Sequence, residues 1–163
     1  MKLRSKVTRT LTVAAVCATL AVTSTGIANA ASFTWQGYTR DSTWNCGPAG
    51  STKDVGGLYV LPCTKTIGAS WQVILIVTGG GASRILSDDE LQMWNGNYDG
   101  LDCSGNVEAG QEFAPGQSLA CFSPTLTNAN TAVQGRFELT VYDDAANFIA
   151  SADIVSPKVT TGS

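Results

Sequence analysis

A run of eight residues in the middle of the chain, 71–78 (WQVILIVT), places the strongest constraint on the fold. The run is rich in β-branched residues, is bounded by Gly68 and by three glycines at 79–81, and is short for a helix. Apolar residues occupy both of its faces, which is the pattern of a strand covered on each side. We therefore expect a central strand in a β-rich fold.

A second segment, 137–154, has the alternating pattern of a β-hairpin with one buried face. Apolar residues alternate over 137–142, a polar turn follows at 143–147, and the alternation resumes at Phe148. Trp71, Phe137 and Phe148 fall in the buried phases and are expected in the core. Shorter strands are expected at 33–39, 58–61, 84–86, 111–113 and 117–122. This spacing predicts an all-β fold, a single antiparallel β-sandwich that is either Ig-like or jelly-roll-like.

One segment favours a short helix instead. Ser87-Asp88-Asp89-Glu90 has the spacing of a capping box, its acids suit the first turn of a helix, and Asn95-Gly96 would end it. The pattern predicts a helix from Asp88 to Trp94. A strand at 91–94, with the acids in the turn before it, is the open alternative, because short apolar runs fit both structures.

The N-terminus has the three parts of a secretory signal peptide. Four basic residues lie within the first nine positions, an apolar stretch follows at 11–22, and an A-x-A site lies at 28–30. We expect a signal peptide at 1–30, a β-sandwich domain at 31–156 and a flexible tail at 157–163. The protein is then secreted and extracellular, and no apolar stretch reaches the roughly 20 residues that a membrane-spanning helix needs.

Cleavage would remove Cys17 and leave four cysteines, Cys46, Cys63, Cys103 and Cys121. Four cysteines in an oxidising compartment indicate two disulfides. We favour pairing each cysteine with the next along the chain, Cys46 with Cys63 and Cys103 with Cys121, although three connectivities stay open. The sequence lacks the closely spaced cysteine pairs that a four-thiolate zinc site uses.

Composition excludes several functions. The chain has no histidine, which rules out Ser-His-Asp and Cys-His catalysis and histidine-ligated metal sites. The mature chain would keep six basic and 13 acidic residues, a net charge of −7, which argues against nucleic acid and anionic membranes as partners. Paired carboxylates for glycoside hydrolysis remain as a residual alternative. We expect a monomeric protein that is not an enzyme.

The segment 95–100 (NGNYDG) matches the start of a calcium-binding loop, in which Asn95, Asn97 and Asp99 would supply oxygen ligands. The expected bidentate glutamate is absent, and Asn106 stands in its place. The same residues also suit tight turns, because Asn, Asp and Gly tolerate positive φ. Calcium is the one cofactor that the sequence suggests, and the turn interpretation stays open beside it.

Three aromatic residues, Trp44, Trp94 and Tyr98, lie among Asn, Asp, Gly and Ser residues. Such surroundings are typical of aromatic rings that stack on sugars or anchor a partner. With Asn97, they form the predicted site for an extracellular glycan or cell-surface ligand. The structural alternative is that Trp44 packs over the Cys46 disulfide and Trp94 closes one end of the sheet.

A second functional hypothesis is a secreted hydrolase inhibitor or other protein-binding factor. The loops 47–50 and 122–124 each lie beside a cysteine. A disulfide that stiffens such a loop reduces the entropy lost on association. The sequence thus favours a non-catalytic binding protein whose partner is an extracellular glycan or a secreted protein.

Overall fold

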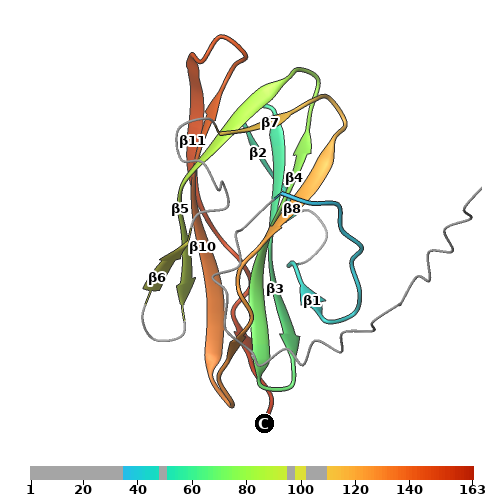
Figure 1. Ribbon diagram of the computed structural model, residues 1–163, viewed down its shortest axis with the longest axis vertical. Coiled ribbons are helices and arrows are strands. Elements are labelled where there is room, and N and C mark those ends of the chain that lie inside the picture. The colour runs from blue at the N-terminus through green and yellow to red at the C-terminus, as the bar shows by residue number, and fades with distance from the viewer. Residues whose placement is uncertain (1–34, 48–50, 95–97, 102–109) are drawn as a thin grey trace, which may run out of the picture.

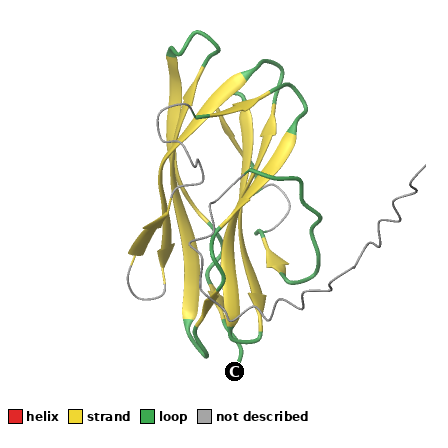
Figure 2. Cartoon of the chain, in the orientation of Figure 1, coloured by secondary structure: helices red, strands yellow, loops and turns green. Residues whose placement is uncertain are grey.

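The computed structural model describes residues 35–47, 51–94, 98–101 and 110–163, with the backbone alone for 88–94 and 98–101. These residues form two antiparallel sheets, and none of them is helical. The two sheets lie side by side along the length of the molecule (Figure 1). Strands joined by turns and loops make up the whole described chain (Figure 2).

The first sheet has the strand order β1-β3-β4-β8, with β2 also paired to β3 and β9 to β4. Its strands are β1 (Trp44–Asn45), β2 (Lys53–Val55), β3 (Leu58–Ile67), β4 (Ser70–Gly79), β8 (Ser118–Phe122) and β9 (Leu126–Thr127). The second sheet has the order β11-β10-β5-β6, with β12 paired to β10 and β7 to β5. Its strands are β5 (Arg84–Trp94), β6 (Tyr98–Leu101), β7 (Gln111–Phe113), β10 (Ala132–Tyr142), β11 (Phe148–Val155) and β12 (Val159–Thr160).

The predicted central strand is confirmed as β4, which is hydrogen-bonded between β3 and β8. Val73 and Leu75 on one of its faces belong to the main core, and Ile74 and Ile76 on the other face belong to a second buried cluster. The run is therefore apolar on both faces because both faces are covered.

The main core contains buried side chains from both sheets. Val73 of β4 lies in the same cluster as Phe137 and Leu139 of β10. The backbone of β10 lies close against the Val73 side chain here, since a Cβ added to Gly135 would lie 2.6 Å from Cγ1 of Val73. Only glycine fits such an approach. This shared core is compatible with the predicted β-sandwich.

The predicted helix from Asp88 to Trp94 is wrong, because these residues continue strand β5. The strand that the alternative placed at 91–94 is confirmed as part of β5, whereas the turn it assigned to the acids is wrong, because they lie in the same strand. Strand β5 pairs with β10 along nine positions, with Ser87 opposite Thr140 and a bulge that leaves Asp89 as the extra residue. A capping box is worth about 1 kcal/mol. Pairing with β10 and β6 outweighs that local preference.

The predicted hairpin is confirmed as β10 and β11, but Phe148 is not a core residue. Val141 pairs with Ala150 and Tyr142 with Phe148, so a bulge leaves Ile149 as an extra residue. One extra residue reverses the alternation beyond it. Phe148 is consequently 63% exposed, whereas the sequence pattern assigned it to the buried phase.

Both ends of the described chain differ from the expectation. Within the expected strand 33–39, the described residues contain one isolated bridge, Gln36 with Ala120. Residues 157–163, expected as a flexible tail, include strand β12, which pairs with Ala132 and Val133, and a buried Thr161. A two-residue strand has no alternation from which it could be predicted.

The predicted disulfide between Cys46 and Cys63 is present. It joins the chain just after β1 to the middle of β3. Cys121 is buried, and its expected partner, Cys103, lies outside the described residues. The second disulfide therefore stays a prediction.

Candidate functional site

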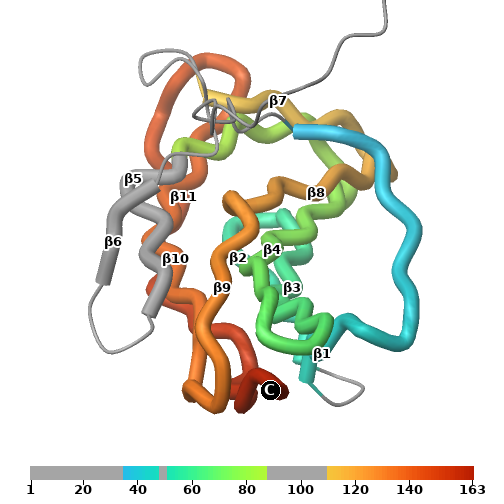
Figure 3. Tube along the Cα trace, turned by 60° about the horizontal axis from the view of Figure 1, so that its bottom comes forward, coloured from blue at the N-terminus to red at the C-terminus, as the bar shows by residue number. Residues whose placement is uncertain are grey.

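Residues 35–46, which we call the covering segment, cross the outside of the first sheet. The segment is bridged to β8 at Gln36 and ends at β1, which pairs with β3. Figure 3 shows it in blue, running beside the first sheet to β1. Tyr38 and Trp44 of this segment pack against the cluster that contains Ile74 and Ile76. The segment thus covers the outer apolar face of β4.

Trp44, one of the predicted ligand-binding aromatics, is only 9% exposed. Its ring stacks on Tyr38 with centroids 6.1 Å apart, and it meets the edge of Phe122 at 5.6 Å. It shares a buried cluster with Cys46 and Cys63. This environment agrees with the structural alternative, in which Trp44 packs over the disulfide.

Trp94 and Tyr98 are directly paired across the β5–β6 hairpin. Trp94 is also the register partner of Gln134 in β10. The structure therefore brings backbone positions 94 and 98 together in the second sheet and places them apart from Trp44, which lies in the first (Figure 1). Asn97, the fourth predicted ligand-binding residue, lies outside the described residues.

The predicted calcium ligands are only partly described. Asp99 lies in β6 opposite Met93, whereas Asn95 and Asn97 fall outside the described residues. Across the part of the chain that the structure describes, no three acidic or cysteine side chains gather where they could hold a metal ion. The calcium site stays a prediction.

The side of the second sheet that faces away from the core carries a row of polar side chains. Along β10 the core side chains alternate with partly exposed ones, except that Thr140, at an outward position, is only 8% exposed. Their register partners on β11 include Asp153 opposite Glu138 and Ser151 opposite Thr140. We call this surface the outer face of the second sheet; its described members are Gln134, Arg136, Glu138, Thr140, Tyr142, Phe148, Ser151, Asp153 and Val155.

Arg136 links the two carboxylates of this face. Its Nε donates to both carboxylate oxygens of Asp153 at 3.0 Å, and its Nη2 lies 2.6 Å from Asp153 and 2.9 Å from Glu138. Hydrogen bonds from Arg136 hold the pKa of Asp153 below its usual value. Exposed ion pairs contribute little to stability. Their effect here is to tie the guanidinium to Asp153 and Glu138.

An open depression of about 510 Å³ lies beside this ion-pair network. Its lining is Glu138, Leu139, Thr140, Ser151, Ala152 and Asp153. The exposed residues Ser151 and Asp153 and the partly exposed Glu138 therefore border one concavity. Groups of these kinds accept and donate hydrogen bonds to a polyhydroxylated ligand.

An aromatic pair ends the same face. Tyr142 and Phe148 are register partners, and their ring centroids lie 6.4 Å apart with an edge-to-face geometry. The turn beside them is well ordered, because Asp143 Oδ1 accepts the backbone N–H groups of Ala145 and Asn147. The side-chain amide of Asn147, followed by its backbone N–H, lowers the pKa of Asp143. Phe148 thus directly follows a hydrogen-bonded turn.

The two ends of the face are far apart. Gln134, opposite position 94, and Tyr142, opposite Phe148, are eight positions apart on β10. At a rise of about 3.3 Å per residue this distance is about 26 Å.

Sequence reasoning missed the Tyr142–Phe148 pair, because the bulge beside it leaves no pattern in the sequence. The available signal was Tyr142, an aromatic residue at an outward position of a strand.

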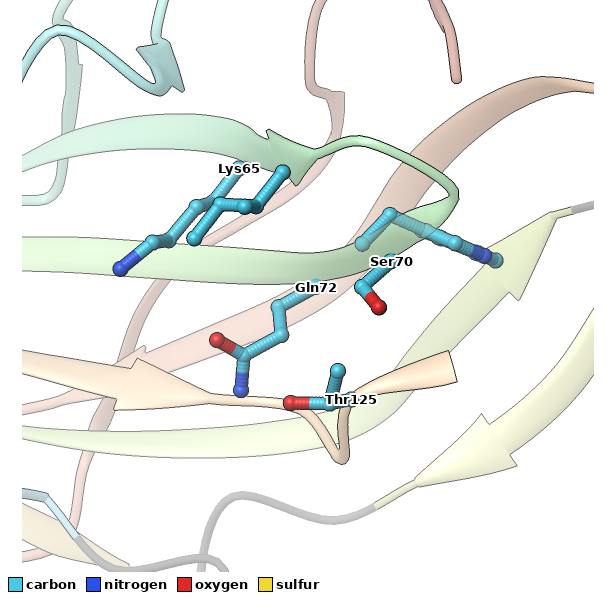
Figure 4. A pocket seen from close by; sticks show the side chains of 6 residues that line it. Lys65, Ser70, Gln72 and Thr125 are labelled. Atoms are coloured by element: carbon cyan, nitrogen blue, oxygen red, sulfur yellow. The ribbon is translucent and has the colours of Figure 1, made fainter. Parts of the chain in front are cut away.

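A smaller pocket lies on the first sheet near the β3–β4 turn. Figure 4 shows Lys65, Ser70, Gln72 and Thr125 around it. Its volume is about 90 Å³, below the roughly 300 Å³ of a typical small-molecule site. Lys65 also pairs with Asp41 at 3.7 Å, and the side-chain amide of Gln72 donates to the Ser123 carbonyl oxygen. Part of the polar lining is therefore already used within the protein.

The inhibitor hypothesis rests on the loops 47–50 and 122–124, of which the structure describes the second in full and the first only in part. Residues 48–50 of the first loop lie outside the described residues. In the second, Phe122 belongs to β8 and Ser123 is buried, with its Oγ accepting the backbone N–H of Val73. The segment 122–124 is therefore tied into the sheet and does not protrude as a binding loop.

The comparisons with known proteins assign no family. No protein-family model matches the chain, and no curated protein matches it. None of the described residues forms a helix of the length and hydrophobicity that crossing a membrane would take.

Proposed function

We propose that this protein is a secreted, non-catalytic binding protein that holds an extracellular glycan chain along the outer face of the second sheet. In this proposal the two sheets form one sandwich domain of Ig-like or jelly-roll-like type. The observation that carries it is the order of side chains on one face, with a polar depression followed by an aromatic pair in which Phe148 is exposed and Tyr142 is half-buried. The Cys46–Cys63 disulfide agrees with export to an oxidising compartment.

The chemistry of this face suits a sugar chain. A sugar has a rim of hydroxyl groups and apolar C–H surfaces, so it needs both hydrogen-bonding groups and aromatic rings. Glu138 and Asp153 supply acceptors, and Ser151 supplies an exposed hydroxyl group beside the depression. Phe148 and the paired positions 94 and 98 supply aromatic residues toward the two ends. The distance between these ends suits an extended chain more than a compact ligand.

The same geometry disfavours glycoside hydrolysis at this face. A hydrolase of that class keeps one carboxylic acid protonated by raising its pKa. Arg136 instead lowers the pKa of Asp153 and also pairs with Glu138. Asp153 is therefore held as a carboxylate, which suits binding and not proton donation.

Replacing Phe148 with alanine is expected to weaken glycan binding about fivefold to 30-fold. The change removes one aromatic surface, whose contact with a ligand is worth about 1–2 kcal/mol. Stability should change by less than about 0.5 kcal/mol, because the side chain is exposed. The measurement is retention of the oxidised protein on insoluble polysaccharides and cell walls, followed by affinity measurement with a soluble oligosaccharide of the polysaccharide that retains it.

Tyr59→Ala is the matched control, because Tyr59 is an aromatic residue that is 47% exposed on β3 of the first sheet. Trp94→Ala tests the other end of the proposed face. Full binding by Phe148→Ala, or an equal loss in Tyr59→Ala, would contradict the proposal. Capture of a secreted hydrolase in a 1:1 complex that free sugars do not displace would favour the inhibitor hypothesis instead.

A further inference from the structure

We infer that the glycan held by this face is an uncharged chain, and that the face selects against chains bearing carboxylate or sulfate groups. This inference rests on the proposed function and adds the chemical class of the ligand. It follows from the distribution of charge around the depression.

Arg136 is the only cationic residue in strands β10 and β11. A guanidinium binds an anionic ligand best when its donors form a bidentate fork to the incoming oxygens. Here Nε and Nη2 already contact the carboxylate of Asp153, and Nη2 also contacts Glu138. The Nε–Nη2 edge of the guanidinium, which could form such a fork, is therefore engaged within the protein.

The charge that remains on the face is negative. Within strands β10 and β11, Asp153 and Glu138 together carry two negative charges against the single positive charge of Arg136. A further cation, Lys53 of β2 in the other sheet, also lowers the pKa of Asp153. On the other side of Glu138, its register partner in β5 is Glu90, a third acidic position in the same row across the sheet. An acidic chain lying along the depression would bring like charges together and be repelled.

An uncharged sugar has no negative charge for the carboxylates of this face to repel. The carboxylate oxygens of Glu138 and Asp153 accept hydrogen bonds from hydroxyl groups, and charge-assisted bonds of this kind are stronger than neutral ones. The exposed hydroxyl group of Ser151 borders the same depression. Acceptors thus dominate the face, which suits a ligand rich in O–H donors.

The test compares polysaccharides that share a backbone and differ in charge. Hydroxyethyl cellulose against carboxymethyl cellulose, and methyl-esterified polygalacturonan against polygalacturonate, are two such pairs. For any backbone that the wild-type protein binds, the neutral member should bind at least about tenfold more tightly in 20 mM salt. The difference should narrow in 500 mM salt, because salt screens repulsion between exposed charges.

Glu138→Gln identifies the source of the selectivity. The variant keeps the shape and an oxygen acceptor for Arg136 but removes the charge, so affinity for the acidic member should rise about fivefold. Affinity for the neutral member should not rise, because the variant offers it a neutral acceptor in place of a charged one. Asp54→Asn is the matched control, because it removes one exposed charge from β2 of the first sheet and retains an acceptor for the Gly57 N–H. The Asp54→Asn variant should bind both the neutral and the acidic polysaccharide with the affinity of the wild-type protein.

The outcomes separate the inference from the proposed function. Binding of the acidic member as tightly as the neutral one overturns the inference and leaves glycan binding in place. Selectivity that is unchanged in Glu138→Gln overturns the role given to Glu138. No retention of any polysaccharide, neutral or acidic, overturns the proposed function itself.

Discussion

Replacing Trp71 with alanine is expected to lower the free energy of unfolding by about 4 kcal/mol. Trp71 is 1% exposed and packs in the main core with side chains of both sheets. The substitution would leave a large cavity, and it would also remove the donor that its Nε1 provides to Asn128 Oδ1 at 3.1 Å. Chemical denaturation followed by circular dichroism measures the loss.

Trp71→Phe is the control for this substitution. It retains most of the buried apolar volume and loses the hydrogen bond, so its cost should be about 1–2 kcal/mol. If alanine and phenylalanine cost the same, the packing of Trp71 between the sheets would not be the source of its contribution. A loss below about 1 kcal/mol for alanine would mean that this part of the core is not formed in solution.

Removing the Cys46–Cys63 disulfide is the second large perturbation. Replacing both cysteines with alanine should cost about 3 kcal/mol, because the bridge closes a loop between positions 17 apart in the sequence. For a domain of this size such a loss lowers the melting temperature by about 10 °C. The measurement is thermal denaturation of the double variant beside the oxidised wild-type protein.

Removing the disulfide should destabilise the covering segment more than the rest of the domain. Tyr38 and Trp44 pack on the outer face of the first sheet just before Cys46, so the disulfide anchors the end of that segment. Hydrogen exchange of the double variant should therefore increase in 35–46 more than in β10 or β11. Equal melting temperatures for the variant and the oxidised wild-type protein would contradict this account.

The elements that the sequence predicted well are those with a local signal. The β-branched run at 71–78 became β4, the alternation at 137–154 became the β10–β11 hairpin, and the cysteine spacing predicted the Cys46–Cys63 bridge. Each of these patterns is contained in a short stretch of chain. Neighbouring residues were sufficient to identify them.

The errors arose where distant pairing overrides a local preference. The capping-box pattern at 87–90 favoured a helix, but these residues lie in β5 and pair with β10. The exposure of Phe148 follows from a bulge opposite Val141 and Tyr142. A bulge depends on the register of two strands, and one strand's alternation does not contain that information.

The candidate site was predicted only in part. The sequence selected Trp94 and Tyr98, and the structure pairs them in the second sheet. Trp44 was selected on the same grounds, because its neighbours are polar. It is buried because β4 is apolar on both faces and requires a cover, which the covering segment supplies. The apolar residues on both faces of β4 were the sequence signal that another segment covers its outer face.

The most direct test of the central claim is to map where a bound glycan lies. Backbone amide spectra of the isotope-labelled protein would be recorded with and without a saturating oligosaccharide of the polysaccharide that retains it. The account predicts shift changes concentrated in β5, β6, β10 and β11, strongest around Glu138, Ser151 and Asp153. Changes concentrated in β3, β4 and β8, or no changes with any oligosaccharide, would contradict it.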